Sequence, residues 1–264
     1  MPNLDTDFVE TPRKDLHVFY ILDTSGSMDG TKISTLNRAM EESTQALADV
    51  AKSNGDAKLK IAVMEFNSGC KWVTSNGPED LEEDFFWDPL KAGGLTDIGA
   101  ALKELNTKLS RKAFLNSMTG ALMPIIIFMT DGYATDNYEK ALEEIRKNRW
   151  FQYGTKIGFA VGDDADLKMI SSVVGNSEAV IRTNDLELFK KLLRFVSVTA
   201  SKLVSQSTTT GTAPTAADIV GAAIDTVTEG DGADVTVTLD PKTYNPEPAP
   251  APAPIDWDDG DVIP

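Results

Sequence analysis

Five short apolar runs alternate with longer amphipathic stretches between residues 15 and 204, and this alternation constrains the fold more than any other feature of the chain. Residues 125–129, three isoleucines followed by Phe128 and Met129, are apolar at every position, which is typical of a strand buried on both faces of a parallel sheet. The runs predict strands at residues 17–22, 59–66, 124–130 and 156–161, with a weaker pattern at 179–182.

The stretches between these runs have the spacing of amphipathic helices. In the first stretch, Ile33, Leu36, Met40 and Leu47 recur near one helical face, and charged residues occupy the other. Helices are predicted at residues 31–52, 97–110, 137–148, 166–174 and 185–203. Strands that alternate with helices of this length predict a doubly wound α/β domain, in which helices cover both faces of a mostly parallel sheet.

The composition changes after residue 204, where we place the end of this domain. We expect an N-terminal segment of residues 1–14, the α/β domain at 15–204, and a flexible, largely disordered acidic tail at 205–264 that is rich in Ser and Thr, then in Pro and Ala, then in Asp. Residues 205–215 have the composition of a linker. A short helix at 216–227 is expected, with too little apolar content for a core. Trp257 is a candidate docking residue in the tail.

The charge of the chain argues against nucleic acid as a partner. The formal net charge is −16, and residues 205–264 account for −10 of it with 11 acidic residues and one basic residue. Nucleic-acid binding needs clustered Lys and Arg, which neither part supplies. No apolar run reaches the roughly 18 residues that span a bilayer, so we expect no membrane partner. The N-terminus lacks a secretory pattern and Cys70 is the single cysteine, which favours a cytoplasmic location.

Oxygen-bearing side chains gather in three of the predicted loops. Asp23, Ser25 and Ser27 follow the first strand at alternate positions, Asp131 follows the all-apolar strand, and Thr96 lies in a Gly-Gly-Leu-Thr loop that precedes a helix. In doubly wound sheets, ligands bind beyond the carboxyl ends of the strands. Hydroxyl and carboxylate oxygens are hard donors, the kind that Mg²⁺ or Mn²⁺ prefers. The sequence therefore predicts a divalent-cation site at this edge of the sheet.

Three further aspartates lie near this predicted site. Asp97 is expected at the N-terminus of a helix, where aspartate is common, and not as a ligand. Asp29 and Asp136 are expected to be solvated loop residues at the rim.

The order D-x-S-x-S, then a threonine, then an aspartate after an apolar strand resembles the von Willebrand factor A (VWA) domain over residues 15–204. The resemblance implies a Rossmann-like fold and a metal-ion-dependent adhesion site (MIDAS) for Mg²⁺, or for Mn²⁺ or Ca²⁺. By position, Ser25, Ser27 and Thr96 correspond to direct hydroxyl ligands. Asp23 and Asp131 correspond to carboxylates that bind the ion directly or through water.

Within this family the chain is most similar to the bacterial intracellular TerY/YegL-type members. That similarity implies a role in a bacterial stress or tellurite-resistance-like system, with kinase- or phosphatase-type proteins among the partners. Three uncharged hydroxyl ligands leave a divalent ion with a preference for an anionic oxygen. We therefore expect a Glu or Asp carboxylate of a partner protein to fill an open coordination position, which makes the chain an interaction module and not an enzyme.

The sequence lacks the familiar enzyme motifs. His17 is the single histidine and begins the first strand, so a Ser-His-Asp triad, a Cys-His pair and a His-rich zinc site have no base or ligands. A Walker loop, a G-x-G-x-x-G turn after the first strand and a G-x-S-x-G elbow are missing. The alternative function is a Mg²⁺-dependent phosphohydrolase that uses Asp23. Such chemistry needs a cation near the metal, for which Lys32 is nearest in sequence. A surface adhesin is a third reading, which the missing signal and anchor disfavour.

Overall fold

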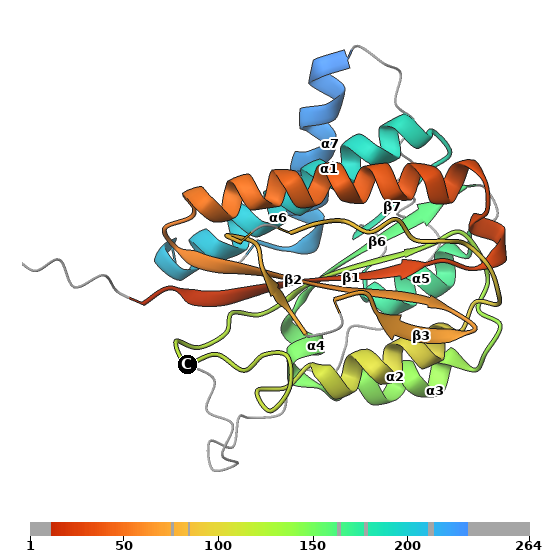
Figure 1. Cartoon of the computed structure of the whole chain (residues 1–264), viewed down its shortest axis with the longest axis horizontal. Coiled ribbons are helices and arrows are strands. Elements are labelled where there is room, and N and C mark those ends of the chain that lie inside the picture. The colour runs from red at the N-terminus through yellow and green to blue at the C-terminus, as the bar shows by residue number, and fades with distance from the viewer. Residues whose placement is uncertain are drawn as a thin grey trace, which may run out of the picture.

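A seven-stranded sheet lies between two layers of helices (Figure 1). The structure is a computed structural model, which describes residues 12–74, 77–83, 85–162, 165–176, 179–210 and 214–231. The strands are β1 (Lys14–Asp23), β2 (Ala57–Asn67), β3 (Gly69–Trp72), β4 (Glu79–Asp80), β5 (Ile125–Thr130), β6 (Thr155–Val161) and β7 (Val180–Thr183). The helices are η1 (Gly26–Met28), α1 (Thr31–Ser53), α2 (Ile98–Lys108), α3 (Tyr138–Ile145), α4 (Arg149–Tyr153), α5 (Leu167–Val174), α6 (Leu186–Thr210) and α7 (Ala216–Asp231).

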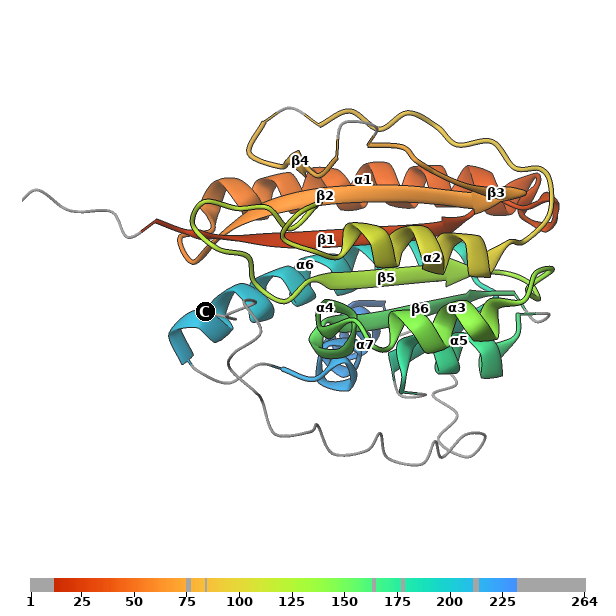
Figure 2. The same cartoon turned by 90° about the horizontal axis from the view of Figure 1, so that it is seen from below.

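The strand order is β3-β2-β1-β5-β6-β7, and β4 also pairs with β2. The strands from β2 to β7 through β1, β5 and β6 run parallel, whereas β3 and β4 are antiparallel to β2. Figure 2 shows β2, β1, β5 and β6 side by side. The chain moves from β1 to one side for β2 and to the other for β5, which makes the end of β1 the switch point where ligands bind. The predicted doubly wound α/β fold is confirmed.

Two apolar cores lie on the two faces of the sheet, because successive residues of each strand point to opposite faces. Val18 of β1 belongs to the core that includes Leu36 of α1 and Phe189 of α6. Phe19, the next residue, belongs to the core that includes Leu102 of α2. All six residues of β5 are buried, as its uniformly apolar sequence predicted. None of the described helices is both long and apolar enough to cross a membrane.

Residues 205–210 of the expected linker are helical in the part of the chain that the structure describes. α6 continues to Thr210, and α7 follows at Ala216–Asp231. The Ser- and Thr-rich composition was misleading because Ser205 lies on the buried side of α6, where its Oγ donates to the Ser201 carbonyl at 2.6 Å. A hydroxyl that bonds within its own helix can be buried at little cost.

α7 adds to the core, which was not expected from its modest apolar content. One of its faces is buried in the core shared with α1, α6 and the sheet, through Ile219, Val220, Ala223 and Val227. These residues lie on one face of the helix and form an apolar stripe. Such a stripe can be buried against the core that neighbouring helices already form, so α7 needs few apolar residues. The expected tail beyond residue 231, including Trp257, lies outside the described residues.

Candidate metal site

The register of β1 against β5 brings the two predicted carboxylates together. Leu22 is opposite Met129, so the next residues, Asp23 and Thr130, end neighbouring strands at the carboxyl edge. Thr130 Oγ1 donates a 2.5 Å hydrogen bond to Asp23 Oδ2, and Asp131 follows directly. Asp23 is 0% exposed and Asp131 is 2% exposed. Two carboxylates that are buried this close together require a compensating positive charge.

Ser25 and Ser27 connect these carboxylates. Asp23 Oδ1 accepts from the Ser25 backbone N–H at 2.7 Å, and the hydroxyl oxygens of Ser25 and Ser27 are hydrogen-bonded at 3.0 Å. Ser27 Oγ then donates to Asp131 Oδ1 at 2.6 Å. Four of the five predicted ligands therefore lie in one continuous hydrogen-bonded network.

Thr96, the fifth predicted ligand, is carried by a separate loop that is fastened to the same place. The Gly93 N–H donates to the Thr24 carbonyl at 2.8 Å, and the Gly26 N–H donates to the Gly94 carbonyl at 3.1 Å. Thr96 is buried, yet within the described residues no hydrogen bond joins its hydroxyl to the other four predicted ligands. The structure therefore brings the loop that carries Thr96 beside the network through backbone hydrogen bonds.

The approach of this loop depends on Gly94. Its φ of 84° lies in the left-handed region, and a Cβ atom at this position would lie 2.7 Å from Ser68 Oγ. That hydroxyl accepts a 3.0 Å hydrogen bond from the Leu95 N–H, so it has little freedom to move. The loop can approach this closely because residue 94 is a glycine, and any residue with a side chain would oppose the approach.

The neighbouring aspartates hold the loops of the site in place. Asp97 begins α2 as expected, but its carboxylate accepts from the Gly69 N–H at 2.8 Å and from Thr135 Oγ1 at 3.1 Å. Asp136 accepts from two successive backbone N–H groups at the start of α2, at 2.9 and 3.0 Å. The expected solvation of Asp136 is wrong, because the unpaired N–H groups of a helix N-terminus attract a carboxylate. Asp29 is exposed, as expected.

Lys32, which the sequence analysis named as the nearest cation, contacts the candidate metal site. It is the second residue of α1, and its Nζ lies 2.5 Å from Asp131 Oδ2. Its side chain remains 30% exposed. The short loop between Ser27 and α1 was a usable signal, because the first turn of that helix must begin at the edge of the sheet where β1 ends. Lys32 offsets part of the charge of Asp131.

The electrostatics of the site fit a hard divalent cation. Burial raises the pKa of the Asp23 carboxyl, hydrogen bonds from Thr130 and Ser25 lower it, and the charge of Asp131 raises it. A bound cation would stabilise both carboxylates in their charged form. Each Asp23 oxygen accepts one hydrogen bond and keeps a lone pair for the ion or for its water.

The donor set selects the class of ion. Two carboxylates and three hydroxyls contain neither sulfur nor nitrogen, which suits Mg²⁺, Mn²⁺ or Ca²⁺. Among the described residues no group of three or more His, Cys, Asp and Glu side chains is placed to hold a metal ion. The sequence assigns the hydroxyls of Ser25, Ser27 and Thr96 to this site beside the two carboxylates, and this assignment stays a prediction.

The residues suited to nucleophilic catalysis lie elsewhere. His17 is buried within β1, as expected of a structural residue. Cys70 lies in β3, where burial raises the pKa of its thiol and the charges of Glu104 and Asp97 raise it further. A raised pKa makes the thiolate scarcer and the thiol less reactive.

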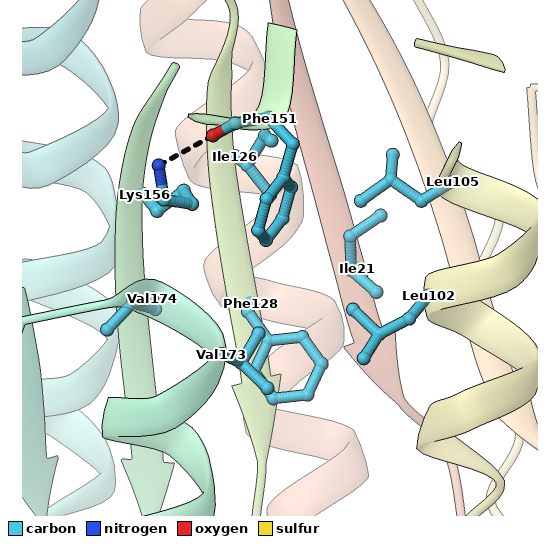
Figure 3. Close-up of a pocket in the computed structure, with 9 residues that line it drawn as sticks. All are labelled: Ile21, Leu102, Leu105, Ile126, Phe128, Phe151, Lys156, Val173 and Val174. Atoms are coloured by element: carbon cyan, nitrogen blue, oxygen red, sulfur yellow. Dashed lines mark hydrogen bonds between the residues drawn. The ribbon is translucent and has the colours of Figure 1, made fainter. Parts of the chain in front are cut away.

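An enclosed cavity beneath α2 and α5 offers no second site (Figure 3). It holds about 10 Å³, which is roughly the space of one water molecule. Its lining is apolar except for Lys156, whose Nζ donates to the Phe151 carbonyl at 2.7 Å and to the Gly154 carbonyl at 2.8 Å. The amine is thus engaged at the C-terminal end of α4.

The sequence matches the model of the von Willebrand factor type A domain over residues 17–195. The chain belongs to this family. The predicted VWA domain is therefore confirmed, and the assignment of its MIDAS to Asp23, Ser25, Ser27, Thr96 and Asp131 stays a prediction. No curated protein matches the chain significantly in sequence.

Several solved structures share the fold of this chain. A von Willebrand factor type A protein from Catenulispora acidiphila has a TM-score of 0.55 at 19% identity, over 71% of this chain and 42% of its own. Proximal thread matrix protein 1 from the mussel byssus, with a zinc-occupied MIDAS motif, has a TM-score of 0.52 at 18% sequence identity, over 71% of this chain and 48% of its own. The pilus adhesin SpaC from Lactobacillus rhamnosus GG has a TM-score of 0.55 at 9% sequence identity, over 74% of this chain and 31% of its own.

These likenesses concern the fold alone, because each identity is below one in five. The chain spans less than half the length of each of these three structures. The TerY/YegL-type assignment is not addressed by them and stays a prediction.

Proposed function

We propose that this chain is a divalent-cation-dependent protein-interaction module. Asp23, Ser25, Ser27, Thr96 and Asp131 would hold the ion, and a Glu or Asp carboxylate of a partner protein would complete its coordination. When bound, the ion supplies a concentrated positive charge that attracts an anionic oxygen.

The observation that carries this proposal is the hydrogen-bonded network from Asp23 through Ser25 and Ser27 to Asp131. Ser27 is exposed at the surface while the two carboxylates are buried beneath it. An ion held there would have protein oxygens below it and open solution above it. The buried side would fix the ion, and the open side would be available to a partner.

The chemistry of the donors favours Mg²⁺, with Mn²⁺ and Ca²⁺ as alternatives. The zinc in the MIDAS motif of the mussel protein supports a divalent ion at the equivalent site of this chain. Calorimetric titration of the metal-free protein with each ion would rank them, and a preference for Zn²⁺ over Mg²⁺ and Mn²⁺ at physiological concentrations would contradict the choice of a hard ion.

The decisive experiment is affinity capture of partners in Mg²⁺ and in EDTA. We expect a partner that is captured by the wild type in Mg²⁺ and lost in EDTA, in Asp23→Ala and in Ser27→Ala. Asp29→Ala is the matched control, since it removes an exposed carboxylate two residues from Ser27 and should retain the partner. The Ser27 variant matters because it removes a surface hydroxyl and leaves the buried carboxylates in place. Binding that survives both EDTA and Ser27→Ala would refute the proposal.

A Mg²⁺-dependent phosphohydrolase is the second candidate, and the contact between Lys32 and Asp131 is the observation in its favour. Against it, both Asp23 oxygens already accept hydrogen bonds and the residue is fully buried, so no free carboxylate faces a substrate. Turnover of p-nitrophenyl phosphate in Mg²⁺ distinguishes the two functions. We expect none above background, and robust activity that disappears in Asp23→Ala would replace the interaction module with the enzyme.

The cellular setting is the furthest step of the proposal. Similarity to TerY/YegL-type members favours a cytoplasmic bacterial stress or tellurite-resistance-like system with kinase- or phosphatase-type partners. The likeness to the pilus adhesin SpaC makes a surface setting the competing possibility. Identification of the captured partner by mass spectrometry decides between them, because cytoplasmic signalling proteins support the first setting and surface or matrix proteins the second.

A further inference from the structure

Two segments of this acidic chain carry Lys and Arg but no Asp or Glu. Residues 105–130 and 145–162 contain no acidic residue, so all 41 Asp and Glu residues of the chain lie outside them. The segments carry seven basic residues, which are Lys108, Arg111, Lys112, Arg146, Lys147, Arg149 and Lys156. The charge totals of the sequence analysis did not reveal this excess, because residues 131–144, with five acidic residues and one basic residue, separate the two segments.

The fold brings these two segments together through Asn148, the residue before α4. Its Nδ2 donates to Asn106 Oδ1 and to the Leu109 carbonyl, each at 3.0 Å, and so holds α4 beside the C-terminal end of α2 (Figure 2). The guanidinium of Arg111 then lies over the Trp150 ring, 6.0 Å from its centroid. Because α4 directly precedes β6, this surface lies at the amino edge of the parallel strands, opposite the candidate metal site.

Three of the cations on this surface, Arg111, Lys112 and Arg149, form what we call the basic end. All three are exposed, and among the described residues no ion pair involves them. Lys108 and Lys147, by contrast, each contact a glutamate nearby in the sequence. The basic end therefore presents positive charge that the surrounding fold does not neutralise.

An exposed aromatic ring borders the basic end. Tyr153 is 46% exposed and follows Arg149 by about one turn of α4, so the two side chains lie on the same side of this helix. Carboxylates pair with guanidinium groups, and aromatic rings pack on other rings. The surface therefore suits a ligand that combines several carboxylates with an aromatic side chain.

The segment at residues 255–264 has this composition. It contains four aspartates, Trp257 and no Lys or Arg. The roughly 24 residues between Asp231 and this segment reach up to about 80 Å if extended, whereas a domain of about 200 residues is about 45 Å across. The segment can therefore reach any face of the domain. Single exposed ion pairs are weak, but a tether of this kind supplies an effective concentration on the order of a millimolar, so weak contacts suffice.

We propose that residues 255–264 dock on the basic end of the same chain. Their aspartates would pair with the cations of the basic end, and Trp257 would pack on Tyr153. Docking would cover a positive surface that otherwise attracts polyanions such as nucleic acid. The proposal does not depend on the metal, because the basic end and the candidate metal site lie at opposite edges of the sheet.

The test is zero-length cross-linking of the full chain with a carbodiimide, which joins a lysine amine to a carboxylate only where the two are in contact. We expect the aspartates of residues 255–264 to be joined to Lys112 at least about fivefold more often than to Lys52 or Lys91, two exposed lysines on the α1 side of the sheet. This preference should persist in EDTA and disappear in about 1 M NaCl, where the Debye length is about 3 Å. Equal yields at the three lysines would overturn the proposal.

Two double variants then locate the contact on the protein. Arg111→Glu combined with Arg149→Glu reverses two charges of the basic end and leaves Lys112 as the reporter, whose cross-links should fall to the level of the two comparison lysines. Arg38→Glu combined with Arg194→Glu is the matched control, because it reverses two exposed charges on α1 and α6 and should keep the preference. Retention of the preference in the first variant, or its loss in the second, would contradict the proposal.

Two other occupants of the basic end give different results in the same protein. Cross-links between ¹⁵N-labelled and unlabelled chains in a mixture would assign the basic end to the acidic segment of a second copy. Binding of a duplex DNA oligonucleotide by the full chain at about 0.15 M salt would assign it to nucleic acid. We expect neither result, and either one would overturn docking within the same chain.

Discussion

At the scale of single residues, Lys32 is a cation that the structure places directly at the candidate metal site. Its ammonium lies 2.5 Å from Asp131 Oδ2, so it neutralises part of the negative charge that would attract a metal ion. A divalent ion and an ammonium group about 6 Å apart repel each other by about 1.4 kcal/mol even at the dielectric constant of water. We predict that Lys32→Met increases the affinity for Mn²⁺ by about tenfold, as measured by calorimetric titration.

Lys52→Met is the control for this prediction. It removes the same charge from the last turn of the same helix, and it should leave the affinity for Mn²⁺ within about twofold of the wild type, because exposed charges more than about 10 Å apart are screened by salt. A loss of affinity in Lys32→Met would instead mean that the ammonium is needed to orient Asp131.

His17 makes the stability of the fold depend on pH. Burial lowers its pKa from 6.5 to about 4, the charge of Asp15 raises it and that of Lys60 lowers it. Among the described residues neither ring nitrogen has a hydrogen-bond partner. Between pH 6.5 and 4, His17 is therefore protonated in the unfolded chain and neutral in the folded chain. The free energy of unfolding consequently falls as the pH falls through this range.

The prediction is a loss of about 3 kcal/mol in the free energy of unfolding between pH 7 and pH 4 from this residue alone. The measurement is urea unfolding of the wild type and of His17→Leu across this range. The variant should lack this part of the pH dependence, and all other titrating groups are common to both proteins. Parallel pH profiles for the two proteins would show that His17 is not responsible.

At the scale of elements, α7 decides where the domain ends. Ile219 is fully buried in the core shared with α1 and α6, so its truncation leaves a cavity. We predict that Ile219→Ala lowers the free energy of unfolding by about 2–4 kcal/mol in urea denaturation. Thr226→Ala, on the exposed side of the same helix, should change it by less than about 0.5 kcal/mol. A neutral Ile219→Ala would place α7 outside the cooperative unit.

The elements of the sheet were predictable because their signals are local. The five expected strands and the five expected helices of residues 15–204 are all present. An apolar run is enough to predict a strand of this kind, and an apolar stripe at helical spacing is enough to predict a helix. The short strands β3 and β4 were missed, because their pairing with β2 depends on where the chain turns back. α7 was underrated for a related reason: the groove that accepts its stripe is formed by residues far away in the sequence.

At the scale of the whole molecule, the site is an assembly of loops that the sheet brings to one edge. The five candidate ligand positions could be proposed from the sequence, because a spaced motif is recognisable without knowledge of contacts, and their role as ligands stays a prediction. The supporting contacts were not, since Thr130 to Asp23, Lys32 to Asp131 and Asp136 to α2 each join segments that only the folded sheet places together. Sequence thus indicated which ion class to expect, and the structure shows how the buried charges are held.

The fold and the metal should be separable, because both cores are apolar and neither contains a metal ligand. The metal-free protein is therefore expected to be folded, and the ion should stabilise it only through binding. At a concentration of 100 times the dissociation constant this linkage contributes about 2.7 kcal/mol, or roughly 5–10 °C in the thermal midpoint for a domain of this size.

Differential scanning calorimetry in Mg²⁺ and in EDTA measures this shift. Ser27→Ala should lose most of it, because the variant removes one ligand and leaves the cores untouched. Asp29→Ala should keep it, which separates specific binding from general attraction of Mg²⁺ to a chain with a net charge of −16. Unfolding in EDTA alone would make the ion a structural part of the fold, and an equal shift in Ser27→Ala would place the ion elsewhere.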